Sequence, residues 1–507
     1  MAINQIKAGA VLNYVIIGLN TLVGLLYTPF MLRCLGQNEY GLYSLVASVV
    51  AYLTILDFGF GNAIVRYTAK FRAEGKTHEQ WELFGMFLFV YSIIGLIAFA
   101  GGMGLYFNVD ALFDRTMTSE DLAQARTMML FLTVNLAFTF PMSIFGSILT
   151  AYEKFVFPRI VNIVRILLST AVMIALLTVG YKAVALVVVQ TVFNVLTLVL
   201  NYIYAKHKLK IKIVFARFNV PLLKEISVYS FWIFLNSIMD KIYWGTGQFV
   251  LGSISGTVAV AVFSVAILLE NMYMTFSTSI CNVLLPRITG MVASNSSFKS
   301  ISDLFIRTGR IQAIVMWAIL AGFVVFGKGF ISLWAGEGYA LSYAITVIFF
   351  ATLFIPLIQN TGIAILQARN QMKFRSLLYL GISVVSLAMQ IVLGKRYGAL
   401  GCAAAIGGAL LLGQGLIMNI YYARRQHIDI ACFWRQIGRL SVIPILLMGV
   451  GMISWRFFDY ADIYVLVSGI AVFAILFVFL MGRFGMNDYE KEIVLYPVKK
   501  IMKRLGR

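Results

Sequence analysis

Long apolar stretches alternate with short polar segments along the whole chain, and each stretch is about as long as one membrane crossing. A helix needs about 20 residues to span roughly 30 Å of hydrocarbon. The pattern therefore predicts an all-α integral membrane protein with about 14 transmembrane helices. The expected spans are 8–32, 42–64, 83–106, 124–150, 160–180, 183–204, 227–251, 258–285, 311–332, 341–366, 377–394, 398–422, 440–457 and 463–482.

Composition supports this class of protein. Of the 507 residues, 61% are hydrophobic and 12% are charged. Soluble domains carry about 25% charged residues, twice the share found here. The longest outer loop, roughly 107–123, is too short for a folded domain. We therefore expect helices and short loops, with no soluble domain.

The distribution of positive charge predicts the orientation. With the N-terminus in the cytoplasm, 32 of the 41 lysines and arginines fall on the inner side, and 9 fall outside. Cytoplasmic loops of membrane proteins are rich in these residues. We expect a protein of the bacterial inner (plasma) membrane with both termini in the cytoplasm. The rule also explains most of the net charge of +20, so nucleic acid is excluded as a partner.

A weak internal repeat divides the chain. Leu35-Gly36 matches Leu251-Gly252, and Pro141 in the fourth span matches Pro356 in the tenth. Spacings near 217 predict two pseudo-symmetric six-helix bundles, and such halves typically enclose a site and rock about it. The predicted domains are a first bundle at 1–215, a second at 216–430, and two extra helices with a basic tail at 431–507.

The paired prolines are candidate hinges. Proline removes a backbone donor and kinks a helix. A kink at the same place in both halves would shape a cavity or allow movement. A kink that serves only packing is the alternative for Pro141 and for Pro356.

Four ionisable residues lie toward the middle of predicted spans: Asp57, Asp240, Lys241 and Glu270. Such a group at mid-bilayer costs roughly 2.5–3.5 kcal/mol, so it usually faces a cavity or a partner. Lys241 is a candidate ligand for an anionic substrate group, and a salt bridge with Asp57 or Glu270 is the alternative. The three acids are candidates for coupling transport to a proton or a sodium ion, with structural ion pairs as the alternative.

The seventh span has a broad polar face. Asn236, Trp244 and Gln248 lie beside Asp240 and Lys241 at helical spacing. Lipid would not tolerate such a face, so we expect it to line a cavity.

Four arginines at span ends are weaker candidates for substrate binding. Arg66, Arg287 and Arg369 lie at inner ends, where ordinary anchoring in the cytoplasmic interface also explains them. Arg33 lies at the outer end of the first span, where positive residues are disfavoured; reaching out to the interface is its alternative explanation.

Two segments near the N-terminus resemble a known family. They are residues 35–45, LGQNEYGLYSL, and residues 56–63, LDFGFGNA, followed by Arg66 and Tyr67. They resemble the loop after the first helix, and the second helix, of polysaccharide transporters in the multidrug/oligosaccharidyl-lipid/polysaccharide superfamily. The two extra C-terminal helices also resemble its lipid-flipping members.

The resemblance implies a flippase for undecaprenyl-diphosphate-linked oligosaccharide, as used for O-antigen or exopolysaccharide. In such transporters a central cationic cavity takes the diphosphate and sugar, while the lipid tail stays in the bilayer. The resemblance further implies an ion gradient or membrane potential as the driving force, and other polysaccharide assembly proteins as partners. The chain departs from this pattern because three buried acids make its expected cavity less cationic.

Three other functions stay open. A cation-coupled multidrug exporter of the same superfamily would usually stop at twelve helices. A polysaccharide polymerase or ligase would be expected to carry its catalytic residues on a long external loop. A scaffold would have no need for buried charges. Histidines and cysteines are scattered and no Walker motif is present, so we expect no metal site, no cofactor and no ATP hydrolysis.

Overall fold

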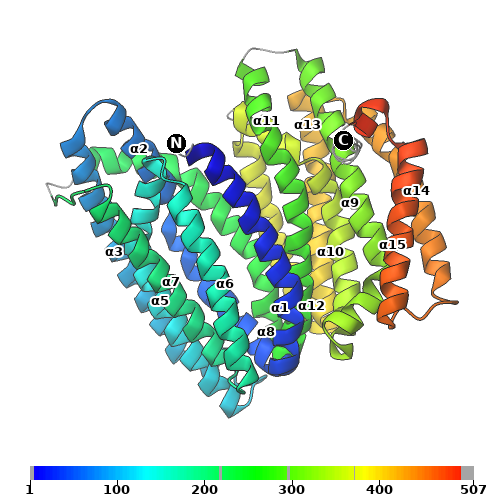
Figure 1. Ribbon diagram of the computed structural model, residues 1–507, viewed down its shortest axis with the longest axis horizontal. Helices are drawn as coiled ribbons and strands as arrows, with labels where there is room; N and C mark the ends of the chain where they lie inside the picture. The colour runs from blue at the N-terminus through cyan, green and yellow to red at the C-terminus, as the bar shows by residue number, and fades with distance from the viewer. Residues whose placement is uncertain (1–4, 216–219, 294–296, 370, 493–507) are drawn as a thin grey trace, which may run out of the picture. The chain divides into compact units, whose positions relative to one another are not determined.

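The computed structural model describes residues 5–215, 220–293, 297–369 and 371–492, and within them all regular structure is helical (Figure 1). The chain divides into two compact units, Met1–Ser264 and Val265–Arg507. The predicted domain boundaries at 215 and 430 are based on the internal sequence repeat, and they stay a prediction.

The first unit contains the elements up to the middle of α8. They are α1 Gln5–Ala51, η1 Tyr52–Asp57, α2 Phe60–Ala73, α3 Thr77–Phe107, α4 Val109–Phe113, α5 Ser119–Ala151, α6 Val156–Thr178, α7 Ala183–His207 and the first part of α8 Val220–Ala293.

The second unit contains the end of α8 and all later elements. They are α9 Phe298–Trp334, η2 Glu337–Tyr339, α10 Ala340–Ile358, α11 Asn360–Ala368, α12 Lys373–Leu410, η3 Leu411–Ile417, α13 Met418–Gln426, α14 Ile430–Ser454, α15 Ile463–Leu480 and η4 Met481–Gly485.

The number of membrane crossings agrees with the 14 that the sequence predicts. Eleven helical segments in the described residues are long and apolar enough to cross a bilayer, and three of them run for 66, 44 and 54 residues. Each of these three contains a glycine with positive φ, at Gly36 (73°), Gly256 (80°) or Gly398 (58°). Glycine adopts this conformation without steric cost, so the chain reverses there. Counted as two crossings each, they bring the total to 14.

The repeat alignment of the first turn needs a correction. The sequence matched Gly36 to Gly252, but the residue with the same positive φ is Gly256. Gly180 and Gly398, which begin or lie in two further turns, also have positive φ. The two copies of the first turn therefore differ by four residues from the ungapped alignment.

The second predicted span is not one continuous helix. The α-helix changes to the 3₁₀ helix η1 at Tyr52. Phe58 (φ 52°) and Gly59 (φ 70°) then adopt left-handed conformations before α2 begins. A left-handed bulky residue is strained and persists only where packing holds it. The ring of Phe58 stacks on that of Phe234 at 4.5 Å, which supplies such packing.

The two predicted hinge prolines have different surroundings. Pro141 lies inside the continuous helix α5, where it leaves the carbonyl of Ala137 without its usual donor. Gly95 of α3 lies against that carbonyl, since a Cβ there would be 2.6 Å from the oxygen. Pro356 lies three residues before the break between α10 and α11 at Gln359. Movement at either proline stays a prediction.

The segment that carries the family resemblance ties several helices of the first unit together. Asn38 donates to the carboxylate of Asp121 at 2.7 Å and accepts from the hydroxyl of Thr257. Glu39 pairs with Lys182 at 3.3 Å. Gly41 approaches the carbonyl of Thr257 so closely that no side chain fits between them. This segment therefore joins α1 to α5 and α8.

The two extra helices pack on α9 in the second unit. Phe326 of α9 is buried with Leu466 of α15. The indole of Trp317 donates to the hydroxyl of Ser441 in α14 at 2.8 Å. Arg310 of α9 forms a buried, two-pronged ion pair with Glu490, which follows η4.

We predict that Gly41→Ala destabilises the protein. Its methyl group would overlap the Thr257 carbonyl, and overpacking costs about 1–3 kcal/mol. Gly18→Ala on the same helix is the matched control, because its Cβ would meet no atom within 4 Å. Thermal melting of the detergent-purified variants should show a lower midpoint for Gly41→Ala alone. Equal midpoints would contradict the close approach.

Candidate functional site

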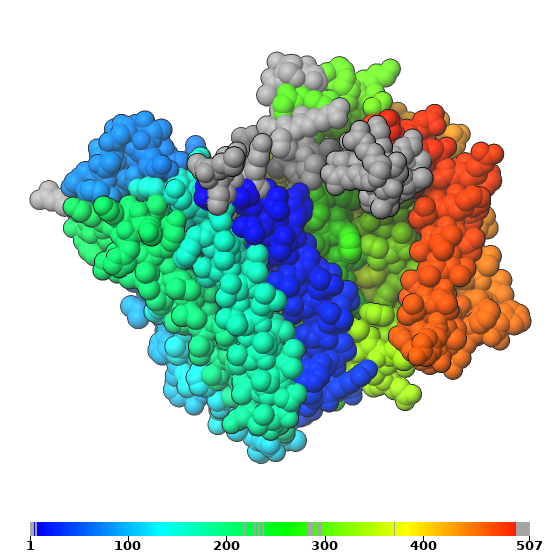
Figure 2. Space-filling view, in the orientation of Figure 1, coloured from blue at the N-terminus to red at the C-terminus, as the bar shows by residue number. Residues whose placement is uncertain are grey.

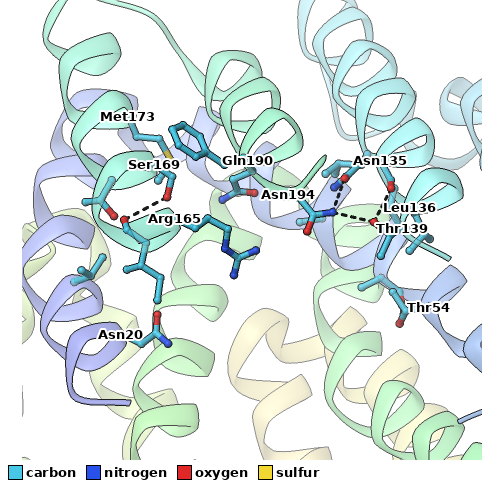
Figure 3. Close-up of a pocket in the computed structure, with 18 residues that line it drawn as sticks. Asn20, Thr54, Asn135, Leu136, Thr139, Arg165, Ser169, Met173, Gln190 and Asn194 are labelled. Atoms are coloured by element: carbon cyan, nitrogen blue, oxygen red, sulfur yellow. Dashed lines mark hydrogen bonds between the residues drawn. The ribbon is translucent and has the colours of Figure 1, made fainter. Parts of the chain in front are cut away.

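A polar cavity of about 530 Å³ lies within the first unit (Figure 3). Five elements supply its walls: α1, η1, α5, α6 and α7. Its polar lining consists of Asn20, Thr54, Asn135, Thr139, Arg165, Ser169, Thr170, Gln190 and Asn194. Arg165 carries the only charge among the residues that line it.

Arg165 lies well inside the membrane-spanning part of α6. It is the tenth of 23 residues, so it lies ~14 Å along the axis from the first residue. Its side chain extends into the cavity (Figure 3). No described residue forms a hydrogen bond or an ion pair with its guanidinium, and Arg165 is half-buried. A charge at this depth costs roughly 2.5–3.5 kcal/mol, which a purely structural residue has no reason to bear.

The opposite side of α6 is apolar. Val164, Leu167 and Leu168 are about half exposed, and α6 runs along the face that Figure 2 shows. Ser169 lies one turn after Arg165 and lines the cavity with it. The helix is therefore amphipathic in the sense expected between lipid and a polar cavity.

A small hydrogen-bond network orders the wall opposite Arg165. The amide of Asn194 in α7 donates to the side-chain oxygen of Asn135 at 2.8 Å and to the hydroxyl of Thr139 at 2.9 Å (Figure 3). No described residue bonds to the amide nitrogen of Asn135 or to the side-chain oxygen of Asn194. A donor and an acceptor thus remain for a ligand.

A second cavity of about 410 Å³ adjoins the first, and Thr54, Leu136 and Thr139 line both. Asp57 and Lys241 line this second cavity together, yet no ion pair links them. The hydroxyl of Tyr91 donates to Asp57 at 2.8 Å. The structure therefore brings two of the predicted site residues, Asp57 and Lys241, into one cavity.

The cavity walls include the break in the second span. Phe58 and Gly59 line the second cavity at the point where the helix is interrupted. Interrupted helices occur in transporters where irregular backbone lines a site. The sequence predicted the charge at Asp57 but not the break beside it.

Three other predicted residues of α8, Asp240, Trp244 and Gln248, are not among the residues that line these cavities. The amide of Gln248 donates to the hydroxyl of Ser264 at 2.7 Å across the turn at Gly256. Trp244 packs edge-on against Tyr243, and Asp240 is exposed. The side chain of Asn236 lies outside the described residues.

The predicted arginines at span ends have ordinary surroundings where they are described. Arg33 and Arg66 are exposed. Arg369 donates to the side-chain oxygen of Gln426 at 2.7 Å, and partial burial lowers the pKa of its guanidinium. Arginine nevertheless stays protonated in proteins. The side chain of Arg287 lies outside the described residues.

Glu270 is buried in the second unit. Its side chain is 1% exposed, and one carboxyl oxygen has no hydrogen-bond partner among the described residues. An ionised carboxylate without partners costs several kcal/mol. The geometry is compatible with a site that takes up a proton or a cation.

Arg165 was missed by the sequence analysis because the charge count placed it with the inner loops. A signal was available, since it falls inside the predicted span 160–180. Asn135 and Asn194 were missed for a different reason. Single amides occur in many spans, and only the packing of α5 against α7 brings these two together.

An all-helical membrane protein with a polar cavity between its helices has the architecture of a membrane transporter. The family described as "Polysaccharide biosynthesis protein" matches residues 6–292, more than half of the chain. The chain belongs to this family, which confirms the resemblance found in its first two spans.

Known proteins similar to this chain share its architecture at low identity. A protein of Shigella flexneri named "Putative O-antigen transporter" is 22% identical over 415 residues, covering 79% of this chain and 94% of the relative. The structure titled "Lipid II flippase MurJ, inward closed conformation" has a TM-score of 0.72 at 16% identity and covers 97% of this chain and 99% of its own.

A multidrug transporter structure is also similar. It is an inward-facing "MATE family transporter of the MOP superfamily", with a TM-score of 0.59 at 14% identity over 82% of this chain and 99% of its own. These two solved structures confirm the predicted all-α membrane fold class.

We predict that Tyr91→Phe destabilises the protein by about 1–3 kcal/mol, because it removes the donor to a partly buried carboxylate. Tyr106→Phe on the same helix is the control, since no described residue accepts from that hydroxyl. In an Asp57→Asn background the Tyr91→Phe effect should shrink, as measured by a double-mutant cycle of melting midpoints. Additive effects would show that the hydroxyl and the carboxyl act independently.

Proposed function

We propose that this chain is a flippase for undecaprenyl-diphosphate-linked oligosaccharide repeat units. It would move them from the cytoplasmic to the outer leaflet of the inner membrane, for O-antigen or exopolysaccharide synthesis. The family match and the similarity to an O-antigen transporter and a lipid II flippase support a lipid-linked oligosaccharide as the substrate class.

One observation carries the proposal: the polar cavity inside the first unit, with an uncompensated guanidinium at Arg165. Its lining of amides and hydroxyls suits the hydroxyl groups of a sugar, and its positive charge suits an anionic group of the substrate. Lys241 in the adjoining cavity supplies a second cation. An oligosaccharide diphosphate needs both kinds of group.

Alternating access would move the substrate. The two-fold repeat of the sequence favours rocking of similar halves, with Pro141 and Pro356 as proposed hinges. The lipid tail would remain in the bilayer, beside the many large hydrophobic side chains that the helices expose.

Coupling to a proton or a sodium ion is proposed at the buried acids. Asp57 shares its cavity with Lys241, and Glu270 has an unpartnered carboxyl oxygen. Asp240 stays a weaker proposal because it is exposed. Binding of the substrate anion by the span-end arginines, and association with other polysaccharide assembly proteins, also stay proposals.

A cation-coupled multidrug exporter is the second candidate, and the likeness to a MATE transporter favours it at the level of fold. The helices α14 and α15, packed on α9, and the family match to polysaccharide biosynthesis support the flippase instead. The family and fold are those of transporters rather than of enzymes, which argues against a polymerase or ligase.

We predict that Lys241→Ala abolishes transport at normal membrane levels, because Lys241 is the only positively charged side chain among the described residues that line its cavity. Mass spectrometry of cells that carry only the variant should show undecaprenyl-diphosphate oligosaccharide, with a membrane-impermeant lectin on spheroplasts placing it on the inner face. Lys224→Ala, an exposed position on the same helix, is the control. Wild-type activity of Lys241→Ala would remove the substrate role. Repeat units that reach the outer face unpolymerised would instead indicate an enzyme or an assembly factor.

We further predict that Asp57→Asn or Glu270→Gln alters how transport depends on pH or on sodium. An amide cannot gain or lose the proton, so the response mediated by that carboxyl should flatten. Asp114→Asn, an exposed loop position, should leave both profiles as in the wild type. Transport in vesicles would be measured across pH at fixed sodium, and across sodium at fixed pH. Unchanged profiles in both buried variants would refute coupling at these acids.

A further inference from the structure

We propose that the cavity around Arg165 binds an oxyanion carried by the sugar itself, so that the transported repeat unit is acidic. The ligand group would be a carboxylate or a phosphate on a sugar, in addition to the diphosphate link. This inference rests on the proposed function and narrows its substrate.

The first argument is the state of Arg165. Arg310 of α9 is an example of a guanidinium whose hydrogen-bonding groups have partners inside a helix bundle. Arg310 bonds both carboxylate oxygens of Glu490, at 2.5 and 2.9 Å, and also reaches the carbonyl of Gly485 at 3.1 Å. Arg165 has no comparable partner among the described residues, and it faces a cavity. A bidentate oxyanion is the ligand that its planar fork fits.

The second argument is the absence of competing charge in the cavity. No aspartate or glutamate is among the residues that line it. The nearest acid in the adjoining cavity, Asp57, accepts from Tyr91 and lies with Lys241. An anion in the first cavity would therefore meet Arg165 without a carboxylate beside it.

The third argument is the chemistry around the guanidinium. Asn20, Ser169, Thr170 and Gln190 line the cavity with the ordered pair Asn135 and Asn194. The free amide nitrogen of Asn135 and the free oxygen of Asn194 offer one donor and one acceptor. Such groups suit sugar hydroxyls, so the anion at Arg165 is expected to be part of a sugar.

The fourth argument is that two adjoining cavities hold one cation each. Lys241 lines one, Arg165 lines the other, and Thr54 and Thr139 form the shared wall. A single headgroup that fills both would place one anion at each cation. The diphosphate accounts for one of them, and an acidic sugar accounts for the other.

The test compares two lipid-linked oligosaccharides that differ in one group. Both carry the same undecaprenyl-diphosphate; one sugar chain contains a uronic acid, and the other is its carboxyl-reduced, neutral form. Proteoliposomes with fluorescent versions of each lipid, and an impermeant quencher, report the flipping rate. The variants are Arg165→Gln and Arg165→Lys, with Arg159→Gln as a control on the same helix but outside the cavity lining.

We expect the wild type to flip the acidic lipid at least about tenfold faster than the neutral one, because a hydrogen bond to a charged group contributes about 1.5–3 kcal/mol. Arg165→Gln should remove that difference by lowering the rate of the acidic lipid to that of the neutral one. Arg165→Lys should restore part of it. Equal losses for both lipids would assign Arg165 to the diphosphate and overturn the proposal, as would an unchanged preference.

A binding measurement separates this proposal from the proposed function and does not depend on the variant folding. The wild-type protein in detergent is melted with the same oligosaccharide released from its lipid and diphosphate, in acidic and carboxyl-reduced form. Stabilisation by the acidic form alone supports the site. Equal or absent stabilisation overturns it. If the wild type moves neither lipid, the flippase fails, while this measurement still decides the anion site.

Discussion

The structure depends on one constraint, the cost of leaving a polar group without a partner in a medium that offers no water. Most of the chain meets it through helix backbone bonds and through pairs such as Arg310 with Glu490. Arg165 and one carboxyl oxygen of Glu270 are exceptions, since neither has a hydrogen-bond partner among the described residues. Arg165, Asp57 with Lys241, and Glu270 are the charged groups that set the candidate sites apart from the surrounding helices.

The first unit combines rigidity and a cavity in the same helices. The segment at residues 35–45 joins α1 to α5 and α8 through Asn38 and Gly41. Between those helices, α5, α6 and α7 leave space lined by amides and one arginine. Because packed contacts hold the walls, the polar groups that face the cavity have defined positions before any ligand arrives, which lowers the cost of binding.

The helix interruption at Phe58 and Gly59 affects where the side chain of Asp57 lies. Where the second span breaks, Asp57 turns toward Tyr91 and faces the same cavity as Lys241. A continuous helix would have directed these groups by its regular period alone. The strained backbone instead places the Asp57 carboxyl and the backbone of Phe58 and Gly59 at the wall of one cavity, to which α8 contributes Lys241.

The number of crossings and the class of protein follow from the sequence alone, because hydrocarbon thickness fixes the length of an apolar stretch. The family follows from the motifs at residues 35–45 and 56–63. The sequence also identified Asp57 and Lys241, since charges inside such stretches stand out. Only the tertiary structure decided that Arg165 faces a cavity with Asn135 and Asn194, that the second span breaks beside Asp57, and that Gly256 rather than Gly252 makes the turn. These features depend on which helix faces pack together, and the hydrophobic periodicity of one helix does not show which helices pack against it.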